Sequence, residues 1–141
     1  HGEKEIRAFK ELSPFPEQEA ARLCYLLLMQ ALPSLAENNI VQFGGVITQL
    51  QRSVGEHFAE AQGGVFASAE VADVMNWFAD QGAVAIGQTS WGPTGFCAVS
   101  GKDRAEQLVQ QAGQRFGNQE TLSFISASAR NNGGEVIVES N

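Results

Sequence analysis

The sequence predicts an α+β fold in which helices pack on a small, mostly antiparallel sheet. The prediction rests on a change of period along the chain. In the first half, apolar residues recur at steps of three and four, as on a helix that buries one face. In the second half, short apolar runs such as residues 83–86 and 96–99 lie next to glycine, as in strands with both faces partly covered. A further helical segment separates these runs from two later ones, so helices and strands share one layered domain.

The length and composition of the chain are those of one globular domain. The chain has 141 residues, of which 43% are hydrophobic and 18% are charged, and we expect residues 1–141 to form a single domain. The formal net charge of −7 disfavours binding to nucleic acid or to an anionic membrane surface. The sequence has no run of about 18 apolar residues, and from its charged N-terminal segment we expect no signal peptide. We therefore expect a cytoplasmic protein with neither a nucleic acid nor a membrane as a partner.

The first expected helix follows an N-terminal arm. Residues 1–15 are expected to be extended or irregular. Pro16 and Glu17 then begin a helix, because proline suits the first turn and an acid suits the positive end of the helix dipole. The run 20–32 is apolar nearly all round its circumference, which predicts a buried central helix. Pro33 is expected to stop or kink it.

Two more helices are expected before the first strand. Residues 40–58 carry one apolar helical stripe, interrupted by Gly44, Gly45 and Gly55, whose use is close approach of a backbone or a ligand. Ser68 is expected to cap the next helix and Gly82 to end it. The apolar face of that helix consists of Val71, Val74, Met75 and Phe78.

The remaining elements complete the predicted sheet. Asp103, with Glu106 three residues later, resembles a capping box at the start of a helix that Gly117 ends. Residues 121–129 and 135–139 are expected to be strands joined by a turn rich in asparagine and glycine. This order of helices and strands is ferredoxin-like.

The connection GQTSWGPTGF, residues 87–96, carries the candidate site. Its glycines allow several backbone N–H groups to converge on an anion, and its hydroxyl and amide side chains add neutral donors. Trp91 offers a flat wall for an aromatic or sugar ring. The pattern misses the phosphate-binding P-loop at Pro93, where a lysine is needed, and a strand follows instead of a helix, which excludes that loop. A hairpin connection with a packed tryptophan is the alternative that the composition leaves open.

This connection resembles the carboxy-terminal glycine-rich motif of the GHMP superfamily of small-molecule kinases. More narrowly, VAIGQTSWGPTGFCAV (84–99), FGGVITQLQRSVGEHFAEAQGGVFAS (43–68) and HGEKEIRAFKEL (1–12) resemble the beta-ribofuranosylaminobenzene 5'-phosphate synthase family. These segments cover most of the chain, and the tryptophan-containing motif is fairly specific to the synthases. The resemblance implies a ferredoxin-like GHMP carboxy-terminal domain. The family's amino-terminal phosphate loop is absent from these residues, so we expect the chain to be part of a longer protein.

The resemblance also implies a reaction. Family members condense phosphoribosyl pyrophosphate with 4-aminobenzoate or 4-hydroxybenzoate and release CO₂ and pyrophosphate, towards methanopterin-type cofactors. Mg²⁺ is implied as the ion that neutralises the leaving pyrophosphate. The implied partners are these small molecules and the protein's own amino-terminal domain, and the isolated domain is expected to turn over poorly or not at all. An ATP-using GHMP-type kinase and a non-catalytic ferredoxin-like module that binds a ligand or forms a homodimer remain as alternatives.

The predicted substrate-binding residues lie in the connection and at two other places. They are Gly87, Gln88, Thr89, Ser90, Trp91, Gly92, Thr94 and Gly95 in the connection, with Gln62 and Arg130 elsewhere. Gln62 is included because the resemblance places it near the same pocket. Arg130 is a candidate for a phosphate or a carboxylate, although a solvated turn arginine is the default for this position.

Other polar residues are given structural roles. His57 is expected to pack or cap rather than to transfer protons. Glu56 and Glu60 are expected to form a solvated helix face rather than a metal site. Cys24 and Cys97 are expected to be buried free thiols. The sequence assigns no catalytic residue and no metal ligand.

Overall fold

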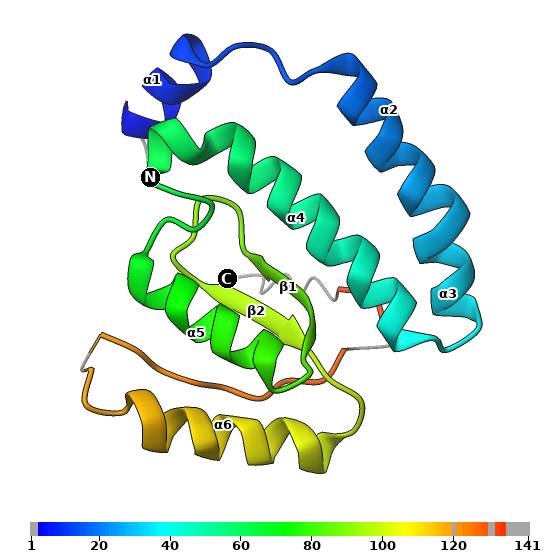
Figure 1. Cartoon of the computed structure of the whole chain (residues 1–141), viewed down its shortest axis with the longest axis vertical. Coiled ribbons are helices and arrows are strands. Elements are labelled where there is room, and N and C mark those ends of the chain that lie inside the picture. The colour runs from blue at the N-terminus through cyan, green and yellow to red at the C-terminus, as the bar shows by residue number, and fades with distance from the viewer. Residues whose placement is uncertain (1–2, 120, 130–131, 135–141) are drawn as a thin grey trace, which may run out of the picture. The chain divides into compact units, whose positions relative to one another are not determined.

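The computed structural model of the chain describes residues 3–119, 121–129 and 132–134 (Figure 1). The chain divides into two compact units, His1–Gly101 and Lys102–Asn141, which are treated separately below. Helices and an antiparallel hairpin together give the α+β fold predicted from the sequence. In the described ranges, no helix combines the length and the apolar character that a membrane crossing needs.

The N-terminal segment is helical. Helix α1 spans Glu3–Glu11, so the expectation of an extended arm is wrong over these residues. The cause lies in local composition, because glutamate, lysine, arginine and alanine all have high helix propensity. Ala8 supplies a buried contact on this helix. The Leu12 N–H donates to the Ala8 carbonyl at 2.9 Å, and the helix ends before Pro14.

Three helical segments then follow without a break. Helix α2 spans Glu17–Leu26 and begins after Pro16, as predicted. The π-helical segment η1 spans Leu27–Ala31 and leads into α3, Leu32–Ala36. Pro33 therefore does not stop the helix. Its ring lacks an N–H and would crowd the carbonyl four residues earlier, and the wider π turn directly before it relieves that crowding.

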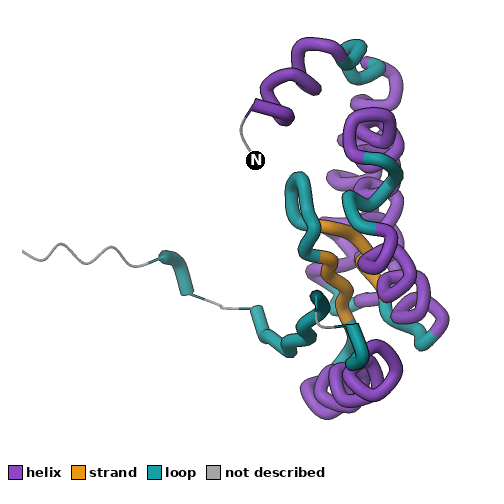
Figure 2. Tube along the Cα trace, turned by 90° about the vertical axis from the view of Figure 1, so that its left-hand side faces the viewer, coloured by secondary structure: helices purple, strands orange, loops and turns teal. Residues whose placement is uncertain are grey.

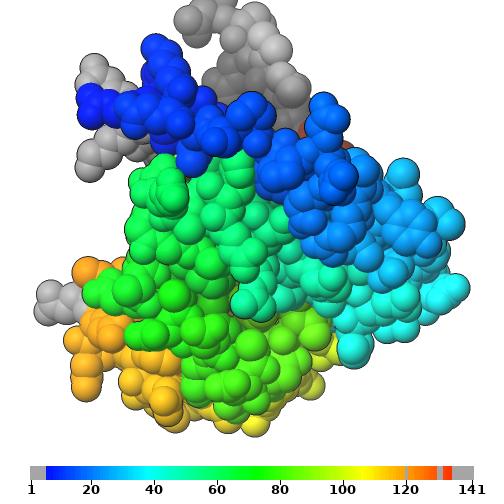
Figure 3. All heavy atoms as spheres, turned by 45° about the horizontal axis from the view of Figure 1, so that its top comes forward, coloured from blue at the N-terminus to red at the C-terminus, as the bar shows by residue number. Residues whose placement is uncertain are grey.

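The stretch from α2 to α3 is not the buried central helix that its composition predicts. It packs on α4 along one side, where Leu23 and Ala31 are buried. Its other side faces solvent, and its residues lie at the surface in the space-filling view (Figure 3, blue to cyan). Large apolar side chains that are more than half exposed there are Tyr25, Leu28, Met29, Leu32 and Leu35. Among the described elements, α4 covers one side of this stretch, and the apolar side chains on the other side stay exposed.

Helix α4, Ile40–Gln62, is the second helix predicted from the apolar stripe and runs four residues past its expected end. The Asn39 side chain caps it by accepting from the Gln42 N–H at 3.1 Å. Gly44 and Gly55 serve close backbone approach, as predicted. A Cβ at Gly44 would lie 2.9 Å from the Ala85 nitrogen, and one at Gly55 would lie 2.6 Å from the Val65 oxygen. A Cβ at Gly45 would meet open space, so that glycine has no such role.

Helix α5, Ala69–Asp80, has the predicted ends. The Ser68 hydroxyl accepts from the Val71 N–H at 3.3 Å, and Gly82 follows the last turn with a φ of 82°. Three members of the predicted apolar face are buried, namely Val74, Met75 and Phe78. These side chains form much of the core of the first unit.

Strands β1, Val84–Gln88, and β2, Gly95–Ala98, form an antiparallel hairpin, with α4 packed along β1 and α5 against both strands (Figure 1). Figure 2 shows the strands in orange and the loop that joins them in teal. Gln88 lies opposite Gly95 in the register, and Gly87 lies opposite Phe96. The ladder is irregular between Val84 and Gly87. The residues between β1 and β2 are those of the candidate site.

The second unit contains α6, Lys102–Phe116, whose buried residues are Leu108 and Ala112. The helix begins before Asp103, which therefore lies in its first turn and not at the cap, and it ends next to Gly117 as predicted. Residues 121–129 form no strand, contrary to prediction. A strand needs a neighbour to pair its N–H and C=O groups, and the expected neighbour, residues 135–139, lies outside the described residues.

Candidate functional site

The loop between β1 and β2 is closed by its own backbone hydrogen bonds. The Thr89 N–H donates to the Thr94 carbonyl at 2.9 Å, and the Gly92 N–H donates to the Thr89 carbonyl at 2.8 Å. Ser90 and Gly92 have positive φ values of 48° and 64°. A Cβ at Gly92 would lie 2.9 Å from Oε1 of Gln88, so this position needs glycine for its conformation and for space. Two of the N–H groups expected to bind an anion are thus used within the loop.

The Gln88 side chain holds this loop from inside. Gln88 is 9% exposed. Its Oε1 accepts from the Ala67 N–H at 2.9 Å, and its Nε2 donates to the Ser90 carbonyl and to Oε1 of Gln62, each at 3.1 Å. The amide therefore links the hairpin loop to the segment after α4.

Gln62 completes this link from the end of α4. Its Nε2 donates to the carbonyls of Gly64 and Val65 at 2.9 and 3.0 Å. Gln62 and Gln88, predicted from separate parts of the sequence, thus lie side by side. Both side-chain amides are already hydrogen-bonded to other groups of the protein. A substrate-binding role for these two residues stays a prediction.

Trp91 joins an aromatic cluster made by α1 and α4. Its ring centroid lies 5.2 Å from that of Phe58 and 5.9 Å from that of Phe9. His57 packs edge to face between Phe15 and Phe58, at 4.9 and 5.0 Å, which confirms its predicted packing role. Trp91 is half-buried, so part of its ring faces solvent beside the exposed residues Thr89, Ser90 and Thr94.

Gly87 and Gly95 let the hairpin approach the helices. A Cβ at Gly95 would lie 2.8 Å from Cγ1 of Val71 and 2.9 Å from Sδ of Met75, both on α5. A Cβ at Gly87 would overlap the side chain of Gln51 on α4. These two glycines therefore have a packing role, and contact with a substrate stays a prediction for them.

Helix α4 covers the outer edge of β1 with polar side chains. The Ile86 N–H donates to the Thr48 hydroxyl at 2.9 Å, and the Gln88 N–H donates to Oε1 of Gln51 at 3.2 Å. Residues two apart on a strand point to one edge, and residues three apart on a helix share a face, so the two pairs match. This arrangement satisfies strand groups that would otherwise be unpaired.

A cavity of about 570 Å³ lies between α4, α5, β1 and the segment after α4. Its lining combines small residues with a few polar ones: Thr48, Gln51, Arg52, Gly63, Gly64, Val65, Phe66, Ala67, Ala69, Ala72, Asn76, Ala79, Ile86, Gly87 and Gln88. Gly87 and Gln88 are the members of the predicted set that line it. Arg130 lies outside the described residues.

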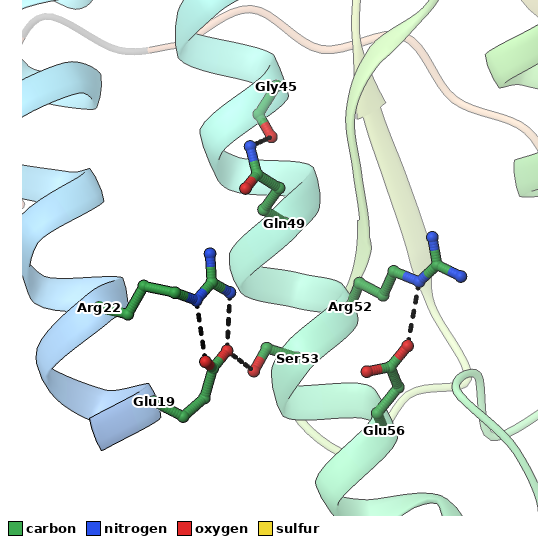
Figure 4. A network of polar contacts seen from close by, with 7 residues as sticks. All are labelled: Glu19, Arg22, Gly45, Gln49, Arg52, Ser53 and Glu56. Carbon is green, nitrogen blue, oxygen red and sulfur yellow. Dashed lines mark hydrogen bonds and ion pairs between the residues drawn. The ribbon is translucent and has the colours of Figure 1, made fainter. Parts of the chain in front are cut away.

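Hydrogen bonds among Glu19, Arg22 and Ser53 join α2 to α4 (Figure 4). The Arg22 guanidinium donates to both oxygens of Glu19 at 2.7 and 2.8 Å, and the Ser53 hydroxyl donates to the same carboxylate at 2.5 Å. Hydrogen bonds from Arg22 and then Ser53 lower the pKa of Glu19 to about 2.

Cys24 and Cys97 are free, as predicted, but Cys24 is exposed rather than buried, because it lies on the uncovered side of α2. Burial raises the pKa of the half-buried Cys97 thiol.

Comparison with known proteins identifies the family. Residues 31–119, more than half of the chain, match the family described as GHMP kinases C terminal. The chain belongs to this family. This GHMP carboxy-terminal domain has no match among solved structures.

The curated relatives share one name. Over 97% of its length the domain is 27% identical to beta-ribofuranosylphenol 5'-phosphate synthase of Archaeoglobus fulgidus, of which it covers 41%. A stretch of 51 residues, 36% of the chain, is 41% identical to the synthase of that name from Methanocaldococcus jannaschii and covers 16% of it. A stretch of 50 residues is 32% identical to the one from Methanothermobacter thermautotrophicus, covering 36% of the chain and 15% of the relative. The chain spans less than half the length of these relatives.

Within the described residues, His, Cys, Asp and Glu side chains nowhere gather in a group of three or more that would hold a metal ion. Glu56 instead pairs with Arg52 at 3.0 Å on an exposed helix face, in agreement with the solvated role expected for it. Mg²⁺ therefore stays a prediction from the family resemblance.

Sequence reasoning missed polar residues of α4 and α5. Thr48 and Gln51 meet the edge of β1, and Arg52 and Asn76 line the cavity. A signal was present, since Thr48 and Gln51 are polar residues three apart on a helix expected to pack on a sheet. The strand that they contact could not be named from the sequence.

Proposed function

We propose that this chain is the carboxy-terminal part of a synthase that joins phosphoribosyl pyrophosphate to 4-hydroxybenzoate or 4-aminobenzoate. The supporting observation is the similarity over 97% of the chain to a protein named beta-ribofuranosylphenol 5'-phosphate synthase. A product of that name carries ribose 5-phosphate on a phenol ring, so its synthesis needs a ribosyl phosphate donor and an aromatic acceptor. The proposal includes a cytoplasmic location and a place in the synthesis of a methanopterin-type cofactor.

The proposed reaction forms one carbon–carbon bond and breaks two bonds. Pyrophosphate leaves ribose C1 with the electron pair of the C–O bond, and the sugar becomes oxocarbenium-like. The ring carbon that bears the carboxylate supplies the pair for the new bond to C1. CO₂ then departs, and the pair from its bond restores the aromatic ring. Mg²⁺, which the family resemblance implies, would supply positive charge to neutralise the leaving pyrophosphate.

In this proposal the hairpin loop forms one wall of the site. Thr89, Ser90 and Thr94 are exposed residues of this loop. The Thr89 hydroxyl donates to the Thr94 carbonyl at 3.4 Å, so the hydroxyl groups of Ser90 and Thr94 are the neutral donors suited to a phosphate. Trp91 presents the uncovered part of its ring beside them, where an aromatic or sugar ring can stack. The Gln62–Gln88 link fixes the loop before substrate arrives, which lowers the ordering cost of binding. The amino-terminal domain of the longer protein supplies the remaining wall.

The test uses the full-length parent protein. It is incubated with Mg²⁺, phosphoribosyl pyrophosphate and each benzoate in turn, and mass spectrometry follows the decarboxylated riboside phosphate. We expect product with at least one acid, together with stoichiometric pyrophosphate. Absence of product from a folded protein with both acids would contradict the proposal.

A parallel incubation with ATP distinguishes the two alternatives. Phosphorylated product, or ATP-dependent ADP release, would support a GHMP-type kinase, because the family match is shared by kinases. A protein that binds a ligand yet converts none of these substrates would support the non-catalytic module.

A further inference from the structure

Helices α2 and α3, with η1 between them, present a stripe of large apolar side chains to solvent. Its members follow the three- and four-residue spacing of one helical face and are 55–61% exposed: Tyr25, Leu28, Met29, Leu32 and Leu35. This set is called the apolar stripe below. The stretch that carries it lies at the surface of the molecule (Figure 3, blue to cyan). A contiguous apolar surface of this kind is typical of a face that another protein surface covers.

Charged residues flank the stripe with opposite signs. Residues 23–36 contain no Asp, Glu, Lys or Arg, although 18% of the chain is charged. Arg22 comes directly before this run and Glu37 directly after it, and both are exposed. Two of the Arg22 nitrogens donate to Glu19, and the third points away from that carboxylate (Figure 4). Each end of the uncharged run can therefore meet a charge on a second surface.

The stripe is complementary to a second copy of itself. Consider two identical antiparallel helices that cross beside residue 30 on a two-fold axis. Each residue then lies opposite the residue that is equally far from the crossing point on the other side. Tyr25 lies opposite Leu35 of the partner subunit, and Leu28 lies opposite Leu32 of the partner subunit. A partner of different sequence would impose no such symmetry on the stripe, so the symmetry favours a second copy as the occupant.

The area of the stripe is sufficient for a dimer. Each of its side chains leaves roughly 100 Å² exposed, so the stripe exposes on the order of 500 Å², as much as the largest apolar patch of a typical monomer. Two copies together would bury about 1,000 Å² from these side chains alone, which is the size that a specific interface needs. Removal of this apolar surface from water favours the paired state.

We propose that two copies of this chain associate through their apolar stripes, with the helices antiparallel about a two-fold axis near residue 30. The same arrangement brings Arg22 close to Glu37 of the partner subunit at both ends of the contact, where opposite charges meet. The proposal concerns assembly and is independent of catalysis, so it can fail while the proposed function holds, and the reverse.

Sedimentation velocity tests the association. The 141-residue chain and its full-length parent are measured at about 100 µM protein, and we expect both to be dimers. Leu32→Glu should raise the dissociation constant about 100-fold, because the interface would bury a carboxylate without a partner. Ile6→Glu is the matched control, since Ile6 on α1 is 57% exposed but is not part of the stripe, and it should leave the mass unchanged. Circular dichroism confirms that the variants are folded, and Leu28→Glu replaces Leu32→Glu if the latter is not.

A charge reversal tests the antiparallel register. Glu37→Arg should weaken the dimer about ten-fold, because position 37 lies opposite Arg22 of the partner subunit and two like charges would then meet. Adding Arg22→Glu to the same chain should restore the affinity, because each pair again has opposite signs.

Intermolecular cross-linking measures the position of the two-fold axis. In a Cys24→Ser background, Met29→Cys should form a disulfide between the two copies with diamide as the oxidant, because residue 29 lies next to the axis. Leu35→Cys should not form one, since the two copies of that position lie roughly 15 Å apart along the helices.

Three outcomes would overturn the proposal. The first is a 141-residue chain that is monomeric at this concentration, and the second is a dimer that neither Leu32→Glu nor Leu28→Glu weakens. The third is a monomeric full-length parent, which would mean that the rest of its polypeptide covers the stripe. A dimer that the stripe variants weaken, but in which Leu35→Cys cross-links and Met29→Cys does not, would contradict the antiparallel arrangement about residue 30.

Discussion

The amide of Gln88 shows how one residue fixes the candidate loop. It is buried and bonded to Ala67, Ser90 and Gln62. Replacement Gln88→Leu keeps the approximate size but removes the partner of the Ala67 N–H, of Oε1 of Gln62 and of the Ser90 carbonyl. We expect the free energy of unfolding to fall by roughly 2–4 kcal/mol, since each unpaired buried group costs about 1–3 kcal/mol. Urea unfolding followed by tryptophan fluorescence measures this change.

A glutamine on α4 serves as the control for that substitution. Gln49 is exposed, and its contact to the Gly45 carbonyl is long, at 3.5 Å (Figure 4). Gln49→Leu should change stability by less than about 0.5 kcal/mol. Equal effects of the two substitutions would contradict a bonded role for Gln88.

The carboxylate of Glu19 makes stability depend on pH. Its pKa falls from 4.5 to about 2 in the folded chain because of hydrogen bonds from Arg22 and Ser53. The unfolded state therefore binds the proton more tightly, so the stabilisation is fully present above pH 4.5 and is lost as the pH falls towards 2. The effect is small because the group is exposed.

Urea midpoints measured from pH 7 to pH 2 test this dependence. The wild type and Glu19→Gln should differ by a constant amount above about pH 5 and converge below pH 4.5. Glu17→Gln, two residues earlier on the same helix, is the control. A gap between wild type and Glu19→Gln that does not narrow in acid would show that the carboxylate is not responsible.

Among the elements, those with local signals were predicted and those that depend on distant partners were not. The capping serine and the glycines correctly predicted both ends of α5 and the end of α6, because a helix cap depends only on residues within about four positions of it. The prediction that the helix beginning at Glu17 is buried was wrong, because apolar residues all round a helix do not show how many neighbours it has. The prediction of a strand at 121–129 was wrong for a related reason. A strand must pair with a neighbouring strand, and the composition of a segment does not show where that neighbour lies.

The candidate site likewise has parts that local sequence signals predicted and parts that depend on distant contacts. The glycine-rich loop was found from its own residues, and Gln62, which the resemblance named, is hydrogen-bonded to Gln88 of that loop. The capping of β1 by Thr48 and Gln51 was missed, as was the cavity lined by Arg52, because both need the packing of α4 on the hairpin. Sequence patterns thus identified the loop, whereas the surroundings that hold it depend on tertiary contacts.

At the scale of the whole molecule, the proposed activity belongs to a chain longer than this one. The domain covers 41% of the A. fulgidus synthase. We therefore expect the 141-residue chain, incubated with Mg²⁺, phosphoribosyl pyrophosphate and either benzoate, to give no riboside phosphate above background while the full-length protein does. Mass spectrometry of matched incubations measures both, and unfolding curves show that the shorter chain is folded. Product from the domain alone would mean that a complete site lies within these residues, and the hairpin loop would then be its centre rather than one of its walls.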